Sequence, residues 1–193
     1  MNIFKYLIAC GEMTKYKVIC VLCCMHISVG FADNNSVSQY ELQAVFLEKI
    51  TRFIDWPENS RVTDKSQLFQ LCVIGTSPMT DALQHLSEIA TIKGKEITVL
   101  ANPDWRVAGK CDLAFIGKGK AEVISKIVDV DGFSPLLTIG DTPGYAEKGV
   151  IINFYEDAGR VRFEINVAEA RQRGFRVSSR LLKLARVVGN EGN

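Results

Sequence analysis

Strict alternation of apolar and polar side chains in residues 160–167 constrains the fold more than any other feature of the chain. The two-residue period is typical of a strand with one buried face. Residues 149–155, which precede it, are β-branched and aromatic, and residues 156–159 form a short loop that ends in glycine. The two strands are therefore predicted to pair as an antiparallel hairpin. Four side chains are expected on its apolar face: Val161, Phe163, Ile165 and Val167.

A closing helix is predicted after the hairpin. Ser178 is a residue type that caps helix N-termini, and the apolar residues that follow recur at helical spacing. The expected apolar stripe consists of Leu181, Leu184, Ala185 and Val188.

Between residues 69 and 140, apolar strands alternate with helices. Strands are expected at residues 69–75, 96–101, 112–117 and 135–140, and helices at residues 77–90 and 121–128. Near-continuous apolar strands separated by helices are typical of a parallel sheet that is covered on both faces. We therefore predict a single-domain α/β fold with a mainly parallel, mixed sheet, helices on both faces, and the C-terminal antiparallel hairpin and helix.

An amphipathic helix is predicted to open the domain. Ser38 and Glu41 have the spacing of a capping box, and Trp56-Pro57 is expected to end the helix. Its apolar stripe is expected to contain Phe46, Leu47, Ile50, Phe53 and Ile54.

The first 32 residues are predicted to be a cleaved signal peptide. Lys15 and Lys17 precede an uncharged run over residues 18–31, and Ala32 ends a stretch of small residues suited to cleavage. Residues 33–193 would then form the exported domain. An uncleaved membrane anchor is the alternative, although the run is short for a membrane span.

Cleavage would leave Cys72 and Cys111 as the only cysteines of the exported domain. An isolated pair in an exported protein favours a disulfide, and a pair of reduced, buried thiols is the alternative. We expect no metal site and no cofactor, because the domain has no CxxC motif and His85 is its single histidine.

Three predicted strands end in glycine-containing loops, which a parallel sheet would gather at its carboxyl edge. Ser77, Lys118 and Asp141 lie in these loops and are the candidate residues of a ligand crevice. Ordinary turn chemistry explains the glycines equally well, and neither a dinucleotide fingerprint nor a phosphate-binding loop motif is present.

The sequence offers no nucleophile and base in a catalytic pattern, so we do not expect an enzyme. With 23 basic and 22 acidic residues, the chain has no excess charge that would favour nucleic acid. The predicted last helix carries a basic stripe, which could be a solvated face or a surface for an acidic partner or lipid headgroups. This stripe consists of Arg176, Arg180, Lys183 and Arg186.

Short motifs along the whole exported domain resemble the YfiR/HmsC family of exported proteins. In chain order they are Tyr40-Glu41, AVFL (44–47), FIDWP (53–57), LCVIG (71–75), Cys111-Asp112, LTIGD (137–141), IINF (151–154), RVRFEIN (160–166) and SSRLLKLA (178–185). The resemblance implies a periplasmic α/β regulator that binds the periplasmic sensory domain of an inner-membrane diguanylate cyclase. Docking would repress the cyclase, lower cyclic di-GMP and restrain biofilm formation.

The resemblance also implies a homodimer and sensitivity to envelope redox state through Cys72 and Cys111. The docking surface is expected on the polar face of the hairpin and on the last helix, with Arg162, Glu164, Asn166, Arg180 and Lys183. Two other functions stay open: a periplasmic small-ligand-binding module that reports to a sensor kinase or another membrane receptor, and an envelope enzyme that uses Asp141.

Overall fold

The computed structural model describes residues 38–128 and 135–189, so the predicted signal peptide lies outside the described residues. No helix within the described ranges is both long enough and apolar enough to cross a membrane. In chain order the elements are α2 (Gln39–Thr51), β1 (Ile54–Asp55), η1 (Arg61–Thr63), β2 (Phe69–Ile74), α3 (Met79–Ile89), β3 (Thr91–Ile92), β4 (Lys95–Ala101), η2 (Trp105–Lys110), β5 (Leu113–Ile116), α4 (Ala121–Val128), β6 (Leu137–Gly140), η3 (Ala146–Lys148), β7 (Ile152–Asp157), β8 (Arg160–Asn166), α5 (Val167–Gln172), β9 (Arg176–Val177), α6 (Ser179–Leu182) and β10 (Arg186–Val188).

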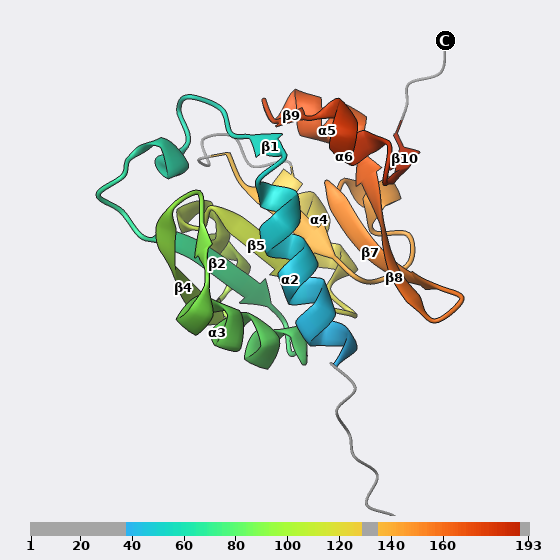
Figure 1. Ribbon diagram of the computed structural model, residues 1–193, viewed down its shortest axis with the longest axis horizontal. Helices are drawn as coiled ribbons and strands as arrows, with labels where there is room; N and C mark the ends of the chain where they lie inside the picture. The colour runs from blue at the N-terminus through green and yellow to red at the C-terminus, as the bar shows by residue number, and fades with distance from the viewer. Residues whose placement is uncertain (1–37, 129–134, 190–193) are drawn as a thin grey trace, which may run out of the picture. The chain divides into compact units, whose positions relative to one another are not determined.

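Within these residues, one eight-stranded sheet has the order β10-β8-β7-β6-β5-β2-β4-β3 (Figure 1). The pairs β7–β8 and β3–β4 are antiparallel, and the other neighbours in the sheet are parallel. The prediction of a single-domain α/β fold with a mainly parallel, mixed sheet is confirmed.

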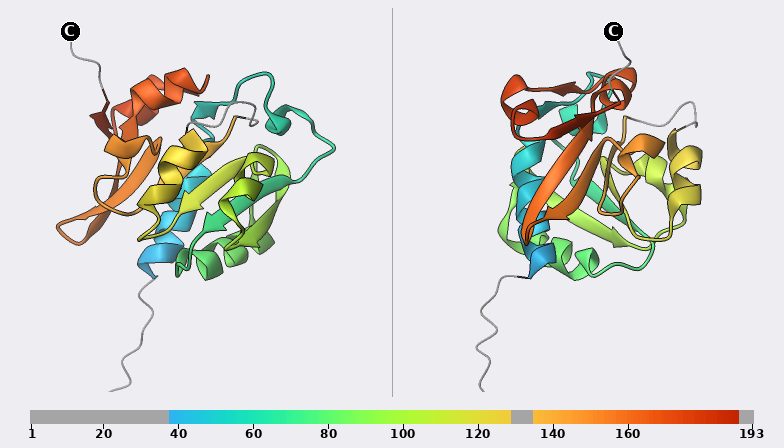
Figure 2. Two further views of the ribbon diagram at one scale, coloured as in Figure 1. Left: turned by 180° about the vertical axis from the view of Figure 1, so that it is seen from behind. Right: turned by 90° about the vertical axis from the view of Figure 1, so that its right-hand side faces the viewer.

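Helices cover both faces of the sheet, which explains why its central strands are apolar on both sides. Along β2, Leu71 and Val73 pack into the core under α2 and α3, whereas Cys72 and Ile74 pack into the core under η2 and α4. Figure 2 shows α2 and α4 on opposite sides of the sheet. The core therefore has two layers, one on each face.

The N-terminal helix begins as predicted and ends earlier than predicted. The Ser38 side chain caps α2, and Glu41 completes the capping box. The helix ends at Thr51, and Ile54 pairs with Val177 of β9 in a separate two-stranded ribbon. Because of this long-range pairing, residues 52–55 do not join the helix, which therefore ends before the Trp56-Pro57 pair that was predicted to end it. Phe53, which was expected in the buried stripe, is 40% exposed.

The predicted closing helix is wrong beyond its first turn. Ser178 caps α6 as expected, but α6 ends at Leu182 and β10 follows it. This strand pairs in parallel with β8, because the backbone groups of residues 186–188 form hydrogen bonds with the edge strand of the sheet, which would otherwise be open. Leu184 is 72% exposed and belongs to no helical apolar stripe. The four basic residues expected on one helix therefore lie on different elements. Arg176 lies on β9, Arg180 on α6, Lys183 at the C-cap of α6 and Arg186 on β10.

The hairpin of β7 and β8 is confirmed, with a tighter turn than the expected four-residue loop. The strands pair up to Asp157 and Arg160, which leaves Ala158 and Gly159 as the turn. Both turn residues have positive φ angles, 49° and 72°, as a two-residue turn between twisted strands requires.

Candidate functional site

The loops that follow β2, β5 and β6 meet at the carboxyl edge of the sheet. The Gly117 N–H donates to the carbonyl oxygen of Ile74 at 2.9 Å. The Tyr145 hydroxyl donates to the carbonyl oxygen of Gly117 at 3.1 Å and accepts from the N–H of Lys120 at 3.0 Å. These bonds hold the loop after β5 against its two neighbours.

Gly75 lets the first two of these loops approach closely. Its φ is +88°, and a Cβ atom at this position would lie 2.9 Å from Cγ of Lys120. The Lys120 stem therefore packs where another residue type would place a side chain. Lys120 thus fixes the loops and does not line the cleft that they border.

A cleft of about 610 Å³ opens at this edge, and the three residues predicted for a crevice, Ser77, Lys118 and Asp141, line it together. Ser77 is held by the start of α3, where its hydroxyl accepts from the N–H of Met79 at 3.2 Å. Lys118 is exposed at the cleft. Burial raises the pKa of Asp141, and the nearby Lys118 charge opposes that rise.

Two walls of the cleft were not predicted from the sequence. They come from α2 and β7 and include Gln39, Tyr40, Gln43, Tyr155 and Glu156. Gln43 is only 2% exposed, and its Oε1 has no hydrogen-bond partner among the described residues. The sequence does indicate that Gln43 is buried, because it stands four residues before Leu47 and seven before Ile50 and so falls on the apolar face of the helix.

The hairpin side chains that were expected to face a partner are only partly available. Glu164 is 1% exposed and Asn166 is 8% exposed, so the prediction that both lie on a free polar face is wrong. Glu164 accepts from Nδ2 of Asn153 at 3.0 Å and from Nε of Arg186 at 2.9 Å. The cause is β10, which was not expected at this edge and which covers β8.

Asn166 has a structural role at the start of α5. Its Oδ1 accepts from the N–H of Glu169 at 2.9 Å, and its Nδ2 donates to the carbonyl oxygen of Ala146 at 2.8 Å. Asn153 likewise donates from Nδ2 to the carbonyl oxygen of Thr142 at 3.0 Å, which connects the buried Glu164 to a loop of the cleft. These amides hold the hairpin against the loops.

A second hollow, a groove of about 530 Å³, runs between α2 and the hairpin and shares Gln39 and Glu156 with the cleft. It is lined mostly by apolar atoms, including those of Leu42, and Arg162 lies at it. Arg162 is exposed, as expected. Arg180 and Lys183 are exposed as well, but they lie at α6 and not at the groove.

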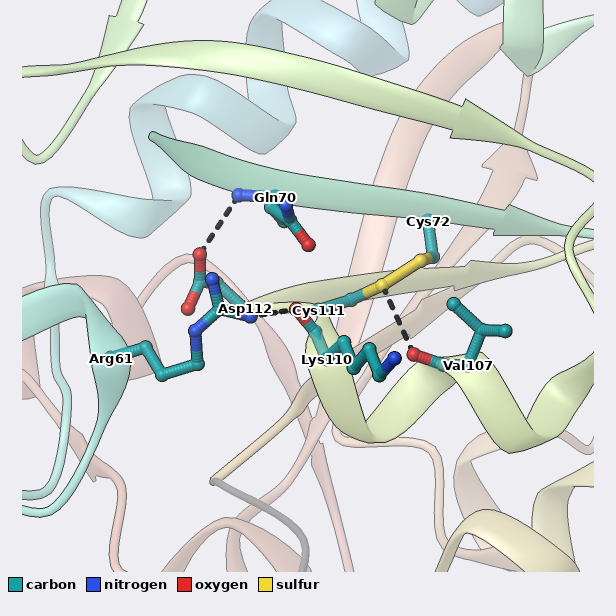
Figure 3. The surroundings of a disulfide bond; sticks show 7 residues. All are labelled: Arg61, Gln70, Cys72, Val107, Lys110, Cys111 and Asp112. Atoms are coloured by element: carbon teal, nitrogen blue, oxygen red, sulfur yellow. Dashed lines mark hydrogen bonds between the residues drawn. A yellow bond between two sulfur atoms is a disulfide. The ribbon is translucent and has the colours of Figure 1, made fainter. Parts of the chain in front are cut away.

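The predicted disulfide between Cys72 and Cys111 is present, with a Cα–Cα distance of 6.0 Å (Figure 3). It joins β2 to the residue that follows η2, a short helix that was not among the predicted elements. Both cysteines are fully buried. Next to them, the carboxylate of Asp112 accepts from the N–H of Gln70 at 2.8 Å, and burial raises the pKa of Asp112.

His85, the one histidine of the predicted exported domain, and the acidic side chains form no metal centre in the described part of the chain. His85 is exposed on α3. In residues 38–128 and 135–189, no three His, Cys, Asp or Glu side chains are grouped in a way that could hold a metal ion.

Comparisons with solved structures give similar folds. The first is a conserved domain protein from Vibrio cholerae O1 biovar El Tor, with a TM-score of 0.52 and 14% identity over 78% of this chain and 60% of that one. The second is an ABC domain from Streptococcus pneumoniae in complex with L-Trp, with a TM-score of 0.50 and 12% identity over 77% of this chain and 60% of that one. The chain thus spans about three fifths of the length of each, and at these identities the likeness concerns the fold alone.

Comparison with curated protein sequences gives no match. The family model described as YfiR/HmsC-like matches residues 40–186, which include every element from α2 to the start of β10. The match covers most of the chain and agrees with the ordered motifs in the sequence. The chain belongs to the YfiR/HmsC-like family.

Proposed function

We propose that the protein is a periplasmic regulator that binds the periplasmic sensory domain of an inner-membrane diguanylate cyclase and represses it. The observation that carries this proposal is the family match over residues 40–186. Repression would lower cyclic di-GMP and restrain biofilm formation. The protein acts by binding and not by catalysis, and residues 1–32 direct its export as a signal peptide.

The groove between α2 and the hairpin is the proposed docking surface for the cyclase. Leu42 on α2 lines the groove and is 37% exposed, and Val45, three residues further along the same helix but outside the groove lining, is 42% exposed. Arg160 and Arg162 flank the groove and form no ion pair with any residue that the structure describes. An apolar floor beside two free guanidinium groups fits an amphipathic, acidic surface of the partner. Arg180 and Lys183 would add a second basic contact.

The disulfide is the proposed link to envelope redox state, and the active form is proposed to be a homodimer. Because both cysteines are fully buried, a reductant can reach the sulfur atoms only after the domain opens locally. Reduction would then favour the open form and release the cyclase. A Cys72→Ser variant that stays folded and represses as strongly as the wild type would contradict this part of the proposal.

Cyclic di-GMP levels in cells test the docking surface. Deleting the gene is expected to raise cyclic di-GMP, and the wild-type gene is expected to restore the low level. Leu42→Asp should fail to restore it, because a carboxylate on the apolar lining of the groove would repel an acidic partner. Ile89→Asp is the matched control, since Ile89 is a 71% exposed apolar residue outside the groove. Equal repression by both variants would exclude the groove.

A second candidate function is a periplasmic small-ligand-binding module that reports to a sensor kinase or another membrane receptor. The specific observation that favours it is the cleft, where Ser77, Lys118 and Asp141 lie together with Gln43, whose buried amide oxygen has no hydrogen-bond partner in the described part of the chain. A strong rise in melting temperature with one metabolite, without any effect of the protein on cyclic di-GMP, would favour this function.

A further inference from the structure

The cleft at the carboxyl edge has the features of a small-molecule site. Its volume of about 610 Å³ lies within the usual range for ligand pockets. Its walls come from α2, β7 and the loops after β2, β5 and β6, so groups distant in sequence converge on one space. The carboxyl edge of a parallel sheet is also where α/β proteins generally bind ligands.

Gln43 is the observation that points to an occupant. It is 98% buried, it lines the cleft, and its Oε1 has no hydrogen-bond partner among the residues that the structure describes. Buried polar atoms in folded proteins are almost always hydrogen-bonded, because an unmade bond is not replaced by water. Because Oε1 itself has almost no accessible surface, a ligand in the cleft would satisfy it only after the Gln43 amide turns toward the cleft.

The charges around the cleft restrict the class of ligand. Lys118 supplies a donor, whereas Asp141 and Glu156 supply acceptors. None of these three forms an ion pair within residues 38–128 and 135–189. A free anion would meet the two carboxylates, and a free cation would meet the lysine. A hydroxyl group both donates and accepts, so it matches this mixed lining without adding charge.

Two aromatic side chains in the cleft lining also suit a ligand that carries hydroxyl groups. Tyr40 and Tyr155 are half-buried and line the cleft. A tyrosine presents an apolar ring together with a polar hydroxyl, which suits a ligand with both C–H and O–H groups.

We propose that this cleft binds a small, uncharged polyhydroxylated molecule of about the size of a monosaccharide. One ligand hydroxyl donates to Oε1 of Gln43 once that amide turns toward the cleft, and another donates to the carboxylate of Asp141, while Lys118 donates to a ligand oxygen. The proposal does not depend on docking to a cyclase and adds a site to the proposed function. The cleft and the groove share Gln39 and Glu156, so an occupant would lie next to the proposed docking surface.

Thermal melting and titration calorimetry of the exported protein, purified from the periplasm, test the proposal. The probes are D-glucose, D-galactose and D-mannitol, with glycine and inorganic phosphate as charged comparisons. We expect at least one of the three polyhydroxylated probes to bind and to raise the melting temperature as its concentration rises. Gln43→Leu and Asp141→Asn should each weaken that binding about tenfold or more, because each removes a ligand hydrogen bond.

Controls separate lost binding from misfolding. Without ligand, Gln43→Leu should melt at or above the wild-type temperature, because leucine leaves no unpartnered polar atom. Gln84→Leu changes an exposed glutamine on α3 outside the cleft and should bind as the wild type does. The proposal is overturned if no polyhydroxylated probe binds, if only glycine or phosphate binds, or if Gln43→Leu binds the sugar unchanged. None of these results would affect the cyclic di-GMP test of docking.

Discussion

Removing the Cys72–Cys111 disulfide is expected to lower the free energy of unfolding by about 4 kcal/mol. The bond closes a loop between residues 39 positions apart in the sequence. In the chain-entropy relation, a loop of this length restricts the unfolded chain enough to give that value near room temperature. The loop contains β2 from Cys72 onward, α3, β3, β4 and η2, so the bond constrains a large part of the sheet.

Urea unfolding, followed by tryptophan fluorescence, measures this loss. The double variant Cys72→Ala/Cys111→Ala also loses buried sulfur atoms, so the cleaner comparison is oxidised against fully reduced wild-type protein. The reduced wild type should approach the double variant in stability, and reductant should leave the double variant unchanged. Because both cysteines are fully buried, reduction of the native protein should be slow and should accelerate in mild denaturant.

A difference below about 1 kcal/mol between the oxidised and reduced wild type would refute this reasoning. It would mean that the unfolded chain gains little freedom when the bond breaks, or that the oxidised fold is destabilised by an equal amount. Rapid reduction of the native protein at a rate independent of denaturant would contradict the predicted role of local opening.

Three further changes have expected outcomes in the same unfolding assay. Glu164→Gln should destabilise the protein by about 1 to 3 kcal/mol, because the buried carboxylate accepts from Asn153 and Arg186. Asp141→Asn should make stability less dependent on pH. Burial raises the pKa of Asp141, so the folded protein binds this proton more tightly than the unfolded chain, and wild-type stability falls as pH rises from 3.8 through the raised pKa. Ser38→Ala should cost about 1 kcal/mol, because it removes the cap of α2 and half of its capping box.

Each variant has a matched control at a site without the proposed interaction. The controls are Glu156→Gln, Asp157→Asn and Ser87→Ala, respectively; Glu156 and Asp157 are exposed, and Ser87 lies inside α3. A control that changes stability as much as its partner variant would show that the assigned contact is not the cause. A pH profile of Asp141→Asn identical to that of the wild type would contradict the assigned role of burial.

Much of the fold could be predicted because the decisive signals are local. Apolar strands and amphipathic helices alternate in the sequence, and only α/β folds with a mainly parallel sheet bury such strands under helices on both faces. The cleft followed from the same reasoning, since Ser77, Lys118 and Asp141 each follow a strand of a parallel sheet. Loops in these positions meet at one edge whatever their sequence.

The predictions that were wrong concern segments whose structure is decided by contacts with residues distant in the sequence. Residues 54–55 and 186–188 have no strand signal strong enough to outweigh a helical pattern, and they become strands because β9 and β8 lie beside them. The alternation in β8 correctly indicated its two faces, but it could not show that β10 and Asn153 would bury Glu164. Gln43 was missed as a cleft residue because sequence alone does not show that the first turns of α2 border the cleft at the carboxyl edge.

Site-specific photo-cross-linking in intact cells tests the central claim most directly. A photoreactive residue at Leu42 lies on the proposed docking surface, and one at Ile89, which is more exposed, serves as the control. The account predicts that position 42, and not position 89, captures a membrane protein with a periplasmic sensory domain and a diguanylate cyclase domain, identified by mass spectrometry. Capture of a sensor kinase from position 42, or of no membrane protein although the protein is exported and folded, would contradict the account.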